Sequence, residues 1–234
     1  MTIQINNISF FGYERKFRVD ELTKEEVELI IKKNVGHFNE IFHQRVINNI
    51  YLDTQSFSNY TDNLDGIPEK IKIRIRWYGN TFGLIKNPHL EIKMRNEFLV
   101  NKRKYPLNDF KIDNDFSLDD LKKNIISSKV PNRIKEEIKS LRFSLFNTYI
   151  RKYFMSAHNV CRLTIDSDMR FIYLSKNTNL FLKRARDDAI IVELKYNKNK
   201  DNIISMFSSE FPFRMTKCSK YAIGIDKLNM NNLY

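Results

Sequence analysis

The sequence has little of what a disulfide-stabilised, zinc-binding or membrane-spanning protein requires. It contains two cysteines, Cys161 and Cys218, and neither lies in a CxxC pair or at metal-binding spacing from a histidine. A disulfide scaffold or a structural zinc site is therefore not expected, and reduced thiols in a cytosol are. No apolar run approaches the roughly 18 residues that a membrane-spanning helix needs. The first residues, MTIQINNISF, do not show a positively charged stretch followed by an apolar run, so no signal peptide is expected. We expect a cytoplasmic protein without a transmembrane segment.

Glycine is scarce as well, and acidic residues are outnumbered. The six glycines form neither a GxxxxGK nor a GxGxxG motif, so binding of phosphates by a glycine-rich loop is not indicated. Against 28 Asp and Glu there are 40 Lys and Arg, a net charge of +12. With 42% hydrophobic residues the chain is globular, and we expect residues 1–234 to form a single domain. The excess of positive charge predicts a polyanionic partner.

The clearest motif is KIKIRIRWYG, residues 70–79, in which a cation alternates with a large apolar residue. Since successive side chains of a strand point to opposite faces, this pattern predicts a strand with one cationic and one apolar face. Like charges repeated along one face repel each other, so an extended anion is expected to neutralise them. An ordinary strand with a solvated basic face is the alternative.

The same alternation recurs on at least six predicted strands. An open sheet usually buries one face and exposes the other to water, whereas here the apolar faces need helices over them and the other faces are cationic. We therefore predict an α+β fold, a closed tunnel or barrel of about eight antiparallel strands with helices packed outside. Its lumen would be lined by Lys16, Arg74, Arg76, Lys93, Arg151, Arg162 and Lys195.

Helices are predicted between these strands. Thr23 and Glu26 form a capping-box pattern ahead of an apolar stripe, and Ser117 begins a helix that runs to about residue 128. Pro131 begins the next, to about residue 143, residues 201–211 form a short helix, and a last one follows Tyr221. Residues 54–60 are expected to turn away from the preceding strand.

Glu193 is the best candidate for a metal ligand. It lies between Val192 and Leu194 and shares a strand face with Lys195. One carboxylate together with substrate phosphates suffices for Mg²⁺ or Mn²⁺. A buried Glu–Lys pair is the structural alternative. Glu14 and Glu91 are weaker candidates, better explained as ion partners of Arg and Lys.

Eight short motifs in this order resemble one known family. ERKF, VINNIYLDT, IRIRWYG, LEIKMR, YIRKYF, CRLTID, VELKY and SKYAIG look like the catalytic domain of the vacuolar transporter chaperone (VTC) proteins. That family belongs to the triphosphate tunnel metalloenzyme superfamily. The resemblance spans about residues 13–227 and rests on the order of all eight motifs.

The resemblance implies an ATP-dependent polyphosphate polymerase that needs Mn²⁺ or Mg²⁺. Its tunnel cations match the seven residues named above and Lys220, and its metal-binding glutamate matches Glu193. Tyr149, Lys217 and Ser219 match positions near the phosphates. ATP and inorganic polyphosphate, tripolyphosphate or pyrophosphate are the implied partners, and no nucleic acid is expected.

Two departures from the family pattern bear on the activity. The superfamily begins with ExExK, but the first glutamate is replaced by Gly12, which disfavours a two-metal hydrolase and suits the polymerase branch. The chain also lacks the SPX region and membrane helices of eukaryotic relatives. A triphosphatase of the same fold is the first alternative, and a non-catalytic polyphosphate- or RNA-binding module is the second. Aromatic residues fall mostly on apolar faces, which disfavours RNA.

Overall fold

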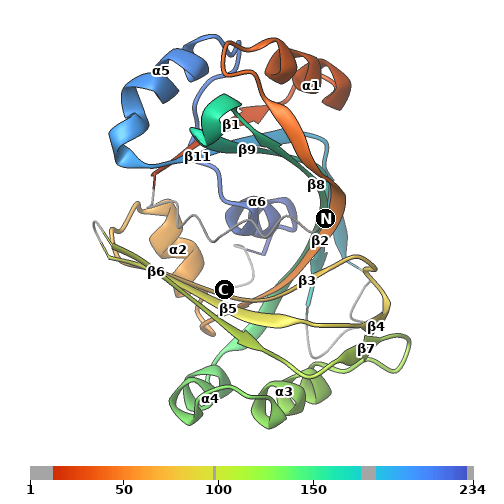
Figure 1. The fold of residues 1–234 in the computed structure, drawn as a ribbon. Helices are drawn as coiled ribbons and strands as arrows, with labels where there is room; N and C mark the ends of the chain where they lie inside the picture. The colour runs from red at the N-terminus through yellow and green to blue at the C-terminus, as the bar shows by residue number, and fades with distance from the viewer. Residues whose placement is uncertain (1–12, 97–98, 175–182, 231–234) are drawn as a thin grey trace, which may run out of the picture. The chain divides into compact units, whose positions relative to one another are not determined.

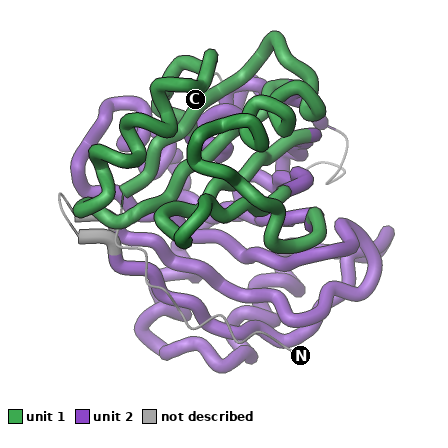
Figure 2. The backbone as a smooth tube through the Cα atoms, turned by 45° about the horizontal axis from the view of Figure 1, so that its top comes forward, with its two compact units in different colours: residues 1–44, 152–167, 189–218 green, residues 45–151, 168–188, 219–234 purple. Residues whose placement is uncertain are grey.

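The computed structural model describes residues 13–96, 99–174 and 183–230 (Figure 1). The chain forms two compact units, shown in different colours in Figure 2. Unit 1 consists of residues 1–44, 152–167 and 189–218, and unit 2 of residues 45–151, 168–188 and 219–234. Three strands contribute to both units: β2 (Asn39–Asp53), β8 (Arg142–Met155) and β9 (Cys161–Tyr173). The single domain over residues 1–234 stays a prediction.

Unit 1 is built on three antiparallel strands. β1 (Tyr13–Val19) pairs with β11 (Ile190–Tyr196), and β11 pairs with β9. Their alternating side chains place apolar residues on one face and charged or polar residues on the other. The apolar face packs against α1 (Lys24–Lys33) and α5 (Asp201–Ser209). Short 3₁₀ turns lie at Ala157–Asn159 and Lys198–Lys200.

The predicted capping box at the start of α1 is confirmed. The side chain of Thr23 accepts a hydrogen bond from the Glu26 amide at 3.3 Å, and the Glu26 carboxylate accepts one from the Thr23 amide at 2.7 Å. Both bonds satisfy amides that the helix itself leaves unpaired. Val27 and Ile31 then point into the core of unit 1.

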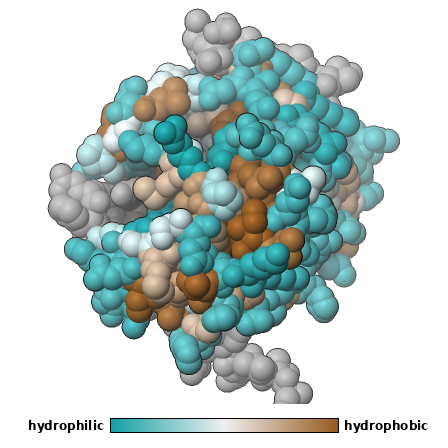
Figure 3. Space-filling view, turned by 90° about the horizontal axis from the view of Figure 1, so that it is seen from above, coloured by the Kyte–Doolittle hydropathy of each residue, from teal (hydrophilic) through white to brown (hydrophobic). Residues whose placement is uncertain are grey.

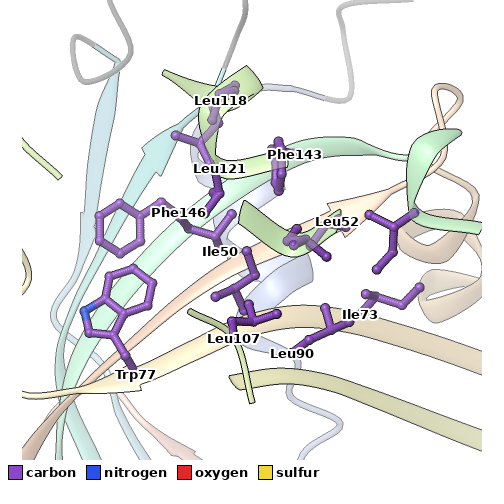
Figure 4. Close-up of a cluster of buried hydrophobic side chains, with 14 of the residues drawn as sticks. Ile50, Leu52, Ile73, Trp77, Leu90, Leu107, Leu118, Leu121, Phe143 and Phe146 are labelled. Carbon is purple, nitrogen blue, oxygen red and sulfur yellow. The ribbon is translucent and has the colours of Figure 1, made fainter. Parts of the chain in front are cut away.

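Unit 2 contains the basic strand and the larger apolar core. β3 (Lys70–Tyr78) lies between β2 and β5 (His89–Asn96), and β5 pairs with β6 (Leu99–Pro106). The apolar face of β3 packs under α3 (Leu118–Ser127) and α4 (Asn132–Lys139), as Figure 4 shows for part of the cluster. Ile75 and Trp77 are almost completely buried there. The remaining strands are β4 (Gly83–Ile85), β7 (Phe110–Ile112) and β10 (Arg184–Asp187).

The cationic face of β3 contacts the start of α6 (Lys220–Lys227), because Lys72 donates to the hydroxyl of Ser219, the residue before the helix. A Cβ added to Gly224 would lie 2.5 Å from side-chain atoms of both Leu145 and Phe171, so a glycine is required for this close packing. Tyr221 anchors the helix because its hydroxyl donates to the buried carboxylate of Asp53 at 2.5 Å. The helices thus cover both faces of the unit 2 strands, with α3 and α4 on the apolar side.

The structure contains one helix where the sequence predicts a turn. α2 (Ser58–Leu64) has no side-chain cap at Phe57, immediately before it. Instead, the carboxylate of Asp53 accepts hydrogen bonds from the amides of Asn59 and Tyr60. The capping group lies outside the local spacing that sequence motifs detect, so the helix was not predictable from such motifs.

The α+β class and the antiparallel strands are confirmed, but the closed barrel is wrong. Hydrogen bonds link the main sheet in the order β1-β11-β9-β8-β2-β3-β5-β6, with β10 on β9. Within the described residues β1 and β6 are the ends of this path, so the sheet is open. Alternation specifies the faces of a strand, whereas closure depends on the tilt and register of all strands together, which alternation does not encode.

Hydrophilic side chains dominate the face seen in Figure 3, with hydrophobic ones in separate patches. Among the described residues, no helix combines the length and apolar character needed to span a bilayer.

Candidate functional site

A buried glutamate surrounded by four cations is the main feature of unit 2. Glu91 on β5 lies opposite Arg74 on β3 and is 2% exposed. Arg74 donates to Glu91 Oε2 from Nη2 at 2.8 Å and from Nε at 3.1 Å, and Arg76 Nη1 lies 3.7 Å from that oxygen. Lys102 and Lys104 approach the other oxygen at 3.1 and 3.3 Å. The single negative charge of Glu91 thus balances only part of four positive charges. We call Glu91 and its four cations, Arg74, Arg76, Lys102 and Lys104, the Glu91 cluster.

Burial and neighbouring charges shift the pKa values of Glu91 and Lys102. Burial by itself raises the pKa of Glu91, but the charges of Arg74, Arg76 and Lys102 together hold it well below its usual range. Burial of the Lys102 ammonium lowers its pKa to about 8, although Glu91 opposes that shift. Glu91 is therefore ionised throughout the physiological range and holds the cations together.

Two asparagines hold Arg76 in place. Arg76 Nε donates to Asn49 Oδ1 at 2.7 Å, and Asn49 Nδ2 donates to Asn147 Oδ1 at 2.8 Å. Both asparagines are fully buried. A third contact, from Arg76 Nη2 to the hydroxyl of Tyr149 at 3.2 Å, completes the support. The guanidinium is therefore oriented before any ligand binds.

Two further predicted cations, Arg151 and Lys220, lie against the ring of Tyr149. That ring lies under the guanidinium of Arg151 at 5.4 Å and the ammonium of Lys220 at 5.1 Å, both within cation–π distance. Ser219, the residue before Lys220, accepts a hydrogen bond from Lys72 at 3.0 Å. Unit 2 thus assembles Arg74, Arg76, Tyr149, Arg151, Ser219 and Lys220, and Lys93 is an exposed residue of β5.

Unit 1 contains a second cluster, of two lysines and two glutamates, on the polar face of β1 and β11. Lys16 Nζ lies 3.6 Å from both Glu14 and Glu193, and Lys195 Nζ lies 3.5 and 3.4 Å from the same two carboxylates. Lys16 also donates to the carbonyl of Cys218 at 3.3 Å. The predicted pairing of Glu14 and Glu91 with cations is thereby confirmed, and the Glu193–Lys195 pair is present.

The register extends this unit 1 cluster onto β9. Arg162 lies opposite Lys195 and Thr164 opposite Glu193, so Lys16, Glu193 and Thr164 form one row across three strands. Lys217 is exposed in the segment before α6. The predicted site residues thus fall into two groups, one in each unit.

The donor set around Glu193 fits a hard divalent cation. Glu193 and Glu14 offer carboxylate oxygens, which Mg²⁺ and Mn²⁺ prefer. The hydroxyl of Thr164 is buried and has no hydrogen-bond partner among the described residues. No group of three acidic, histidine or cysteine side chains with metal-binding geometry occurs in that part of the chain, so further ligands would have to be phosphates and water.

Sequence reasoning missed several residues in the Glu91 cluster and behind it. Asn49 and Asn147 are polar residues in the buried stretches of β2 and β8, which was the available signal. Lys102 and Lys104 lie in the NKRKY run, where consecutive cations conceal the alternation of faces. Their convergence on Glu91 depends on the pairing of β5 with β6.

The VTC domain family matches residues 11–229 of the chain. The chain belongs to the VTC domain family. This confirms the family inferred from the eight sequence motifs, which span nearly the same residues. No curated protein matches the VTC domain described here in sequence.

Several solved structures resemble this VTC domain at low identity. A Pyrococcus horikoshii protein has 8% identity and a TM-score of 0.49, with 92% of this chain and 99% of that one covered. A Hippeastrum protein, named as an adenylyl cyclase with a dominant triphosphatase activity, has 13% identity and a TM-score of 0.48, with 92% and 96% covered. A Vibrio parahaemolyticus protein named as an adenylate cyclase has 9% identity and a TM-score of 0.48, with 91% and 97% covered.

Proposed function

We propose that this VTC domain is a metal-dependent polyphosphate polymerase that transfers the γ-phosphoryl group of ATP to a polyphosphate chain. The observation that carries the proposal is the Glu91 cluster, in which four cations converge on one carboxylate. Such an excess of buried and half-buried positive charge favours a ligand with several negative charges. Guanidinium groups bind phosphate oxygens in pairs, and lysines add point charges.

Phosphoryl transfer requires positioning and charge neutralisation more than covalent help from the protein. A terminal oxygen of the polyphosphate chain would form a bond to the γ-phosphorus as the bond between that phosphorus and the β–γ bridging oxygen breaks. ADP would leave, and the chain would grow by one phosphate. Arg76 suits the positioning role because Asn49 and Tyr149 already hold its guanidinium.

Glu193 would hold a divalent cation, Mn²⁺ or Mg²⁺, with Glu14 as the nearest second carboxylate. When bound, the ion would neutralise charge on phosphate oxygens. Lys16 and Lys195, each within 3.6 Å of both carboxylates, would add positive charge beside the ion.

Hydrolysis of tripolyphosphate or nucleoside triphosphates is the second candidate, with water as the acceptor. It is favoured by Glu14, which lies by the same two lysines as Glu193, so two carboxylates are available despite the Gly12 replacement. Gly12 itself lies outside the described residues.

The test is incubation of the purified protein with ATP and Mn²⁺, with products resolved by gel and by phosphate assay. Long chains together with ADP support the polymerase, and free phosphate alone supports the hydrolase. Tight polyphosphate binding without turnover would leave a binding module and overturn both activities.

Two variants test the proposed roles of Glu193 and Arg74. Glu193→Gln should abolish turnover but leave metal-free polyphosphate binding intact. Arg74→Lys should weaken binding itself because a planar, two-pronged contact is lost. Arg133→Lys is the matched control, since Arg133 is 91% exposed on α4. Normal metal-dependent turnover in a folded E193Q protein would refute the metal assignment.

A further inference from the structure

Thr164 has a buried hydroxyl beside the candidate metal ligand. It lies on β9 directly opposite Glu193 on β11, and the two residues are 2% and 6% exposed. Directly opposed residues of antiparallel strands have Cβ atoms about 4.5–5.5 Å apart on the same face. The two side chains therefore border the same small volume.

The hydroxyl of Thr164 has no hydrogen-bond partner in the described part of the chain. Leaving a buried hydroxyl unpaired costs free energy, and valine would fill the same volume without that cost. Thr164 is followed by Ile165, whose side chain lies in the apolar core on the other face. Packing in the strand therefore does not explain a hydroxyl at this position, whereas a ligand on the polar face does.

We propose that the Thr164 hydroxyl and the Glu193 carboxylate are two adjacent oxygen ligands of one divalent cation. This inference rests on the proposed function, which places the cation at Glu193. Threonine hydroxyls bind Mg²⁺ in other phosphate-handling sites, and the small hard cations prefer oxygen. In the row across the three strands Lys16 lies on one side of Glu193 and Thr164 on the other, so a cation between Glu193 and Thr164 would share the carboxylate with the ammonium groups of Lys16 and Lys195.

The test compares Thr164→Val, which keeps the shape and removes the hydroxyl, with Thr164→Ser, which keeps the hydroxyl. Binding of Mn²⁺ alone is titrated by electron paramagnetic resonance on the whole chain, and melting temperatures are measured without metal. We expect T164V to bind Mn²⁺ at least about tenfold more weakly, because losing a ligand should cost no less than losing a residue that orients a ligand. T164S should stay near the wild type. Metal-free T164V should melt at the same temperature as the wild type or higher, because an unpaired hydroxyl has been removed.

Three results would overturn the inference. Unchanged Mn²⁺ affinity in T164V, with weakened affinity in E193Q, would reject Thr164 and leave the proposed metal site intact. Unchanged affinity in E193Q would reject the metal site and the inference with it. A lower melting temperature of metal-free T164V would show that the hydroxyl already has a structural partner.

Discussion

Arg74 donates from Nε and Nη2 to a single oxygen of Glu91, its cross-strand partner on β5. The other Glu91 oxygen is left to Lys102 and Lys104. Glu91 thus occupies the centre of the cations where a phosphate would be most strongly attracted. We infer that the carboxylate stabilises the cluster in the absence of ligand and competes with an anion that binds there.

The first prediction concerns Glu91→Gln. The variant keeps the size of the side chain but removes the charge that balances four cations, so the free energy of unfolding should fall by about 3 kcal/mol. Tripolyphosphate should then raise the melting temperature more in the variant than in the wild type, because an anion replaces the lost charge. Thermal melts with and without tripolyphosphate measure both effects.

Glu137→Gln on α4 is the control for E91Q, since Glu137 pairs only with the exposed Arg133 among the contacts of the described chain. E137Q should change neither the free energy of unfolding nor the stabilisation by tripolyphosphate by much. Equal tripolyphosphate stabilisation of E91Q and the wild type would contradict the idea that Glu91 competes with the ligand.

The second prediction concerns Tyr149→Phe. The hydroxyl that accepts from Arg76 is lost, while the ring beside Arg151 and Lys220 remains. Stability should fall by about 1 kcal/mol, and tripolyphosphate affinity severalfold, because Arg76 becomes less firmly oriented. Tyr149→Leu removes the ring as well and should lose more affinity. Calorimetric titration distinguishes the two, and identical affinities in Y149F and Y149L would exclude a role for the ring.

The faces of the strands were predictable from the sequence, and their assembly was not. Period-two alternation correctly separated Arg74 and Arg76 from Ile75 and Trp77, because it follows from the geometry of a single strand. Ile71 belongs to the same predicted apolar face as Ile75 and Trp77, but it is 46% exposed near the beginning of β3. Closure of the sheet was predicted wrongly because it depends on all strands at once.

The candidate site was also predictable only in its individual residues and not in how they come together. Cations were identified one by one, yet the residues that orient them were not, because Asn49 and Asn147 become neighbours only when β2 and β8 meet. The sequence also did not show that Glu91 collects four cations, since Lys102 and Lys104 belong to a later strand. Local sequence patterns do not show which distant segments of the chain will be in contact.

The third prediction concerns pH. The pKa of Lys102 is lowered to about 8 from an ordinary value of 10.5, so its charge is present below pH 8 and lost as the pH rises through that value. The unfolded chain keeps this proton up to about pH 10.5. Between pH 8 and about pH 10.5, the contribution of Lys102 to the free energy of unfolding therefore rises with pH. An anion bound at the Glu91 cluster raises this pKa and should cause proton uptake near pH 8.

Calorimetry of tripolyphosphate binding near pH 8, in buffers with different ionisation enthalpies, measures that uptake. Lys102→Arg keeps the charge and removes the titration, so the difference between the two proteins isolates the lysine from protons exchanged by the ligand. Equal uptake by K102R and the wild type would show that Lys102 does not take part.

The last prediction concerns Tyr221→Phe, which disconnects α6 from the buried carboxylate of Asp53. The lost hydrogen bond to a charged group is worth about 1.5–3 kcal/mol. Burial raises the pKa of Asp53 and Tyr221 lowers it, so the variant raises it further. Above its raised pKa a buried carboxyl group is charged, which destabilises the fold. Below the ordinary pKa of an aspartate the group is protonated in both the folded and the unfolded chain and has no such effect. The loss in Y221F should therefore be largest near neutral pH and shrink toward about pH 4.

Urea unfolding at both pH values measures this loss, and tripolyphosphate affinity reports on Lys220, the residue before Tyr221. Tyr60→Phe is the matched control, because Tyr60 donates to Asp226 near the other end of α6. If α6 positions Lys220 through Asp53, Y221F should weaken tripolyphosphate binding severalfold while Y60F weakens it less. A pH-independent loss of stability in Y221F would mean that Asp53 does not become charged in the folded protein, and equal binding by both variants would separate the anchoring of α6 from the Glu91 cluster.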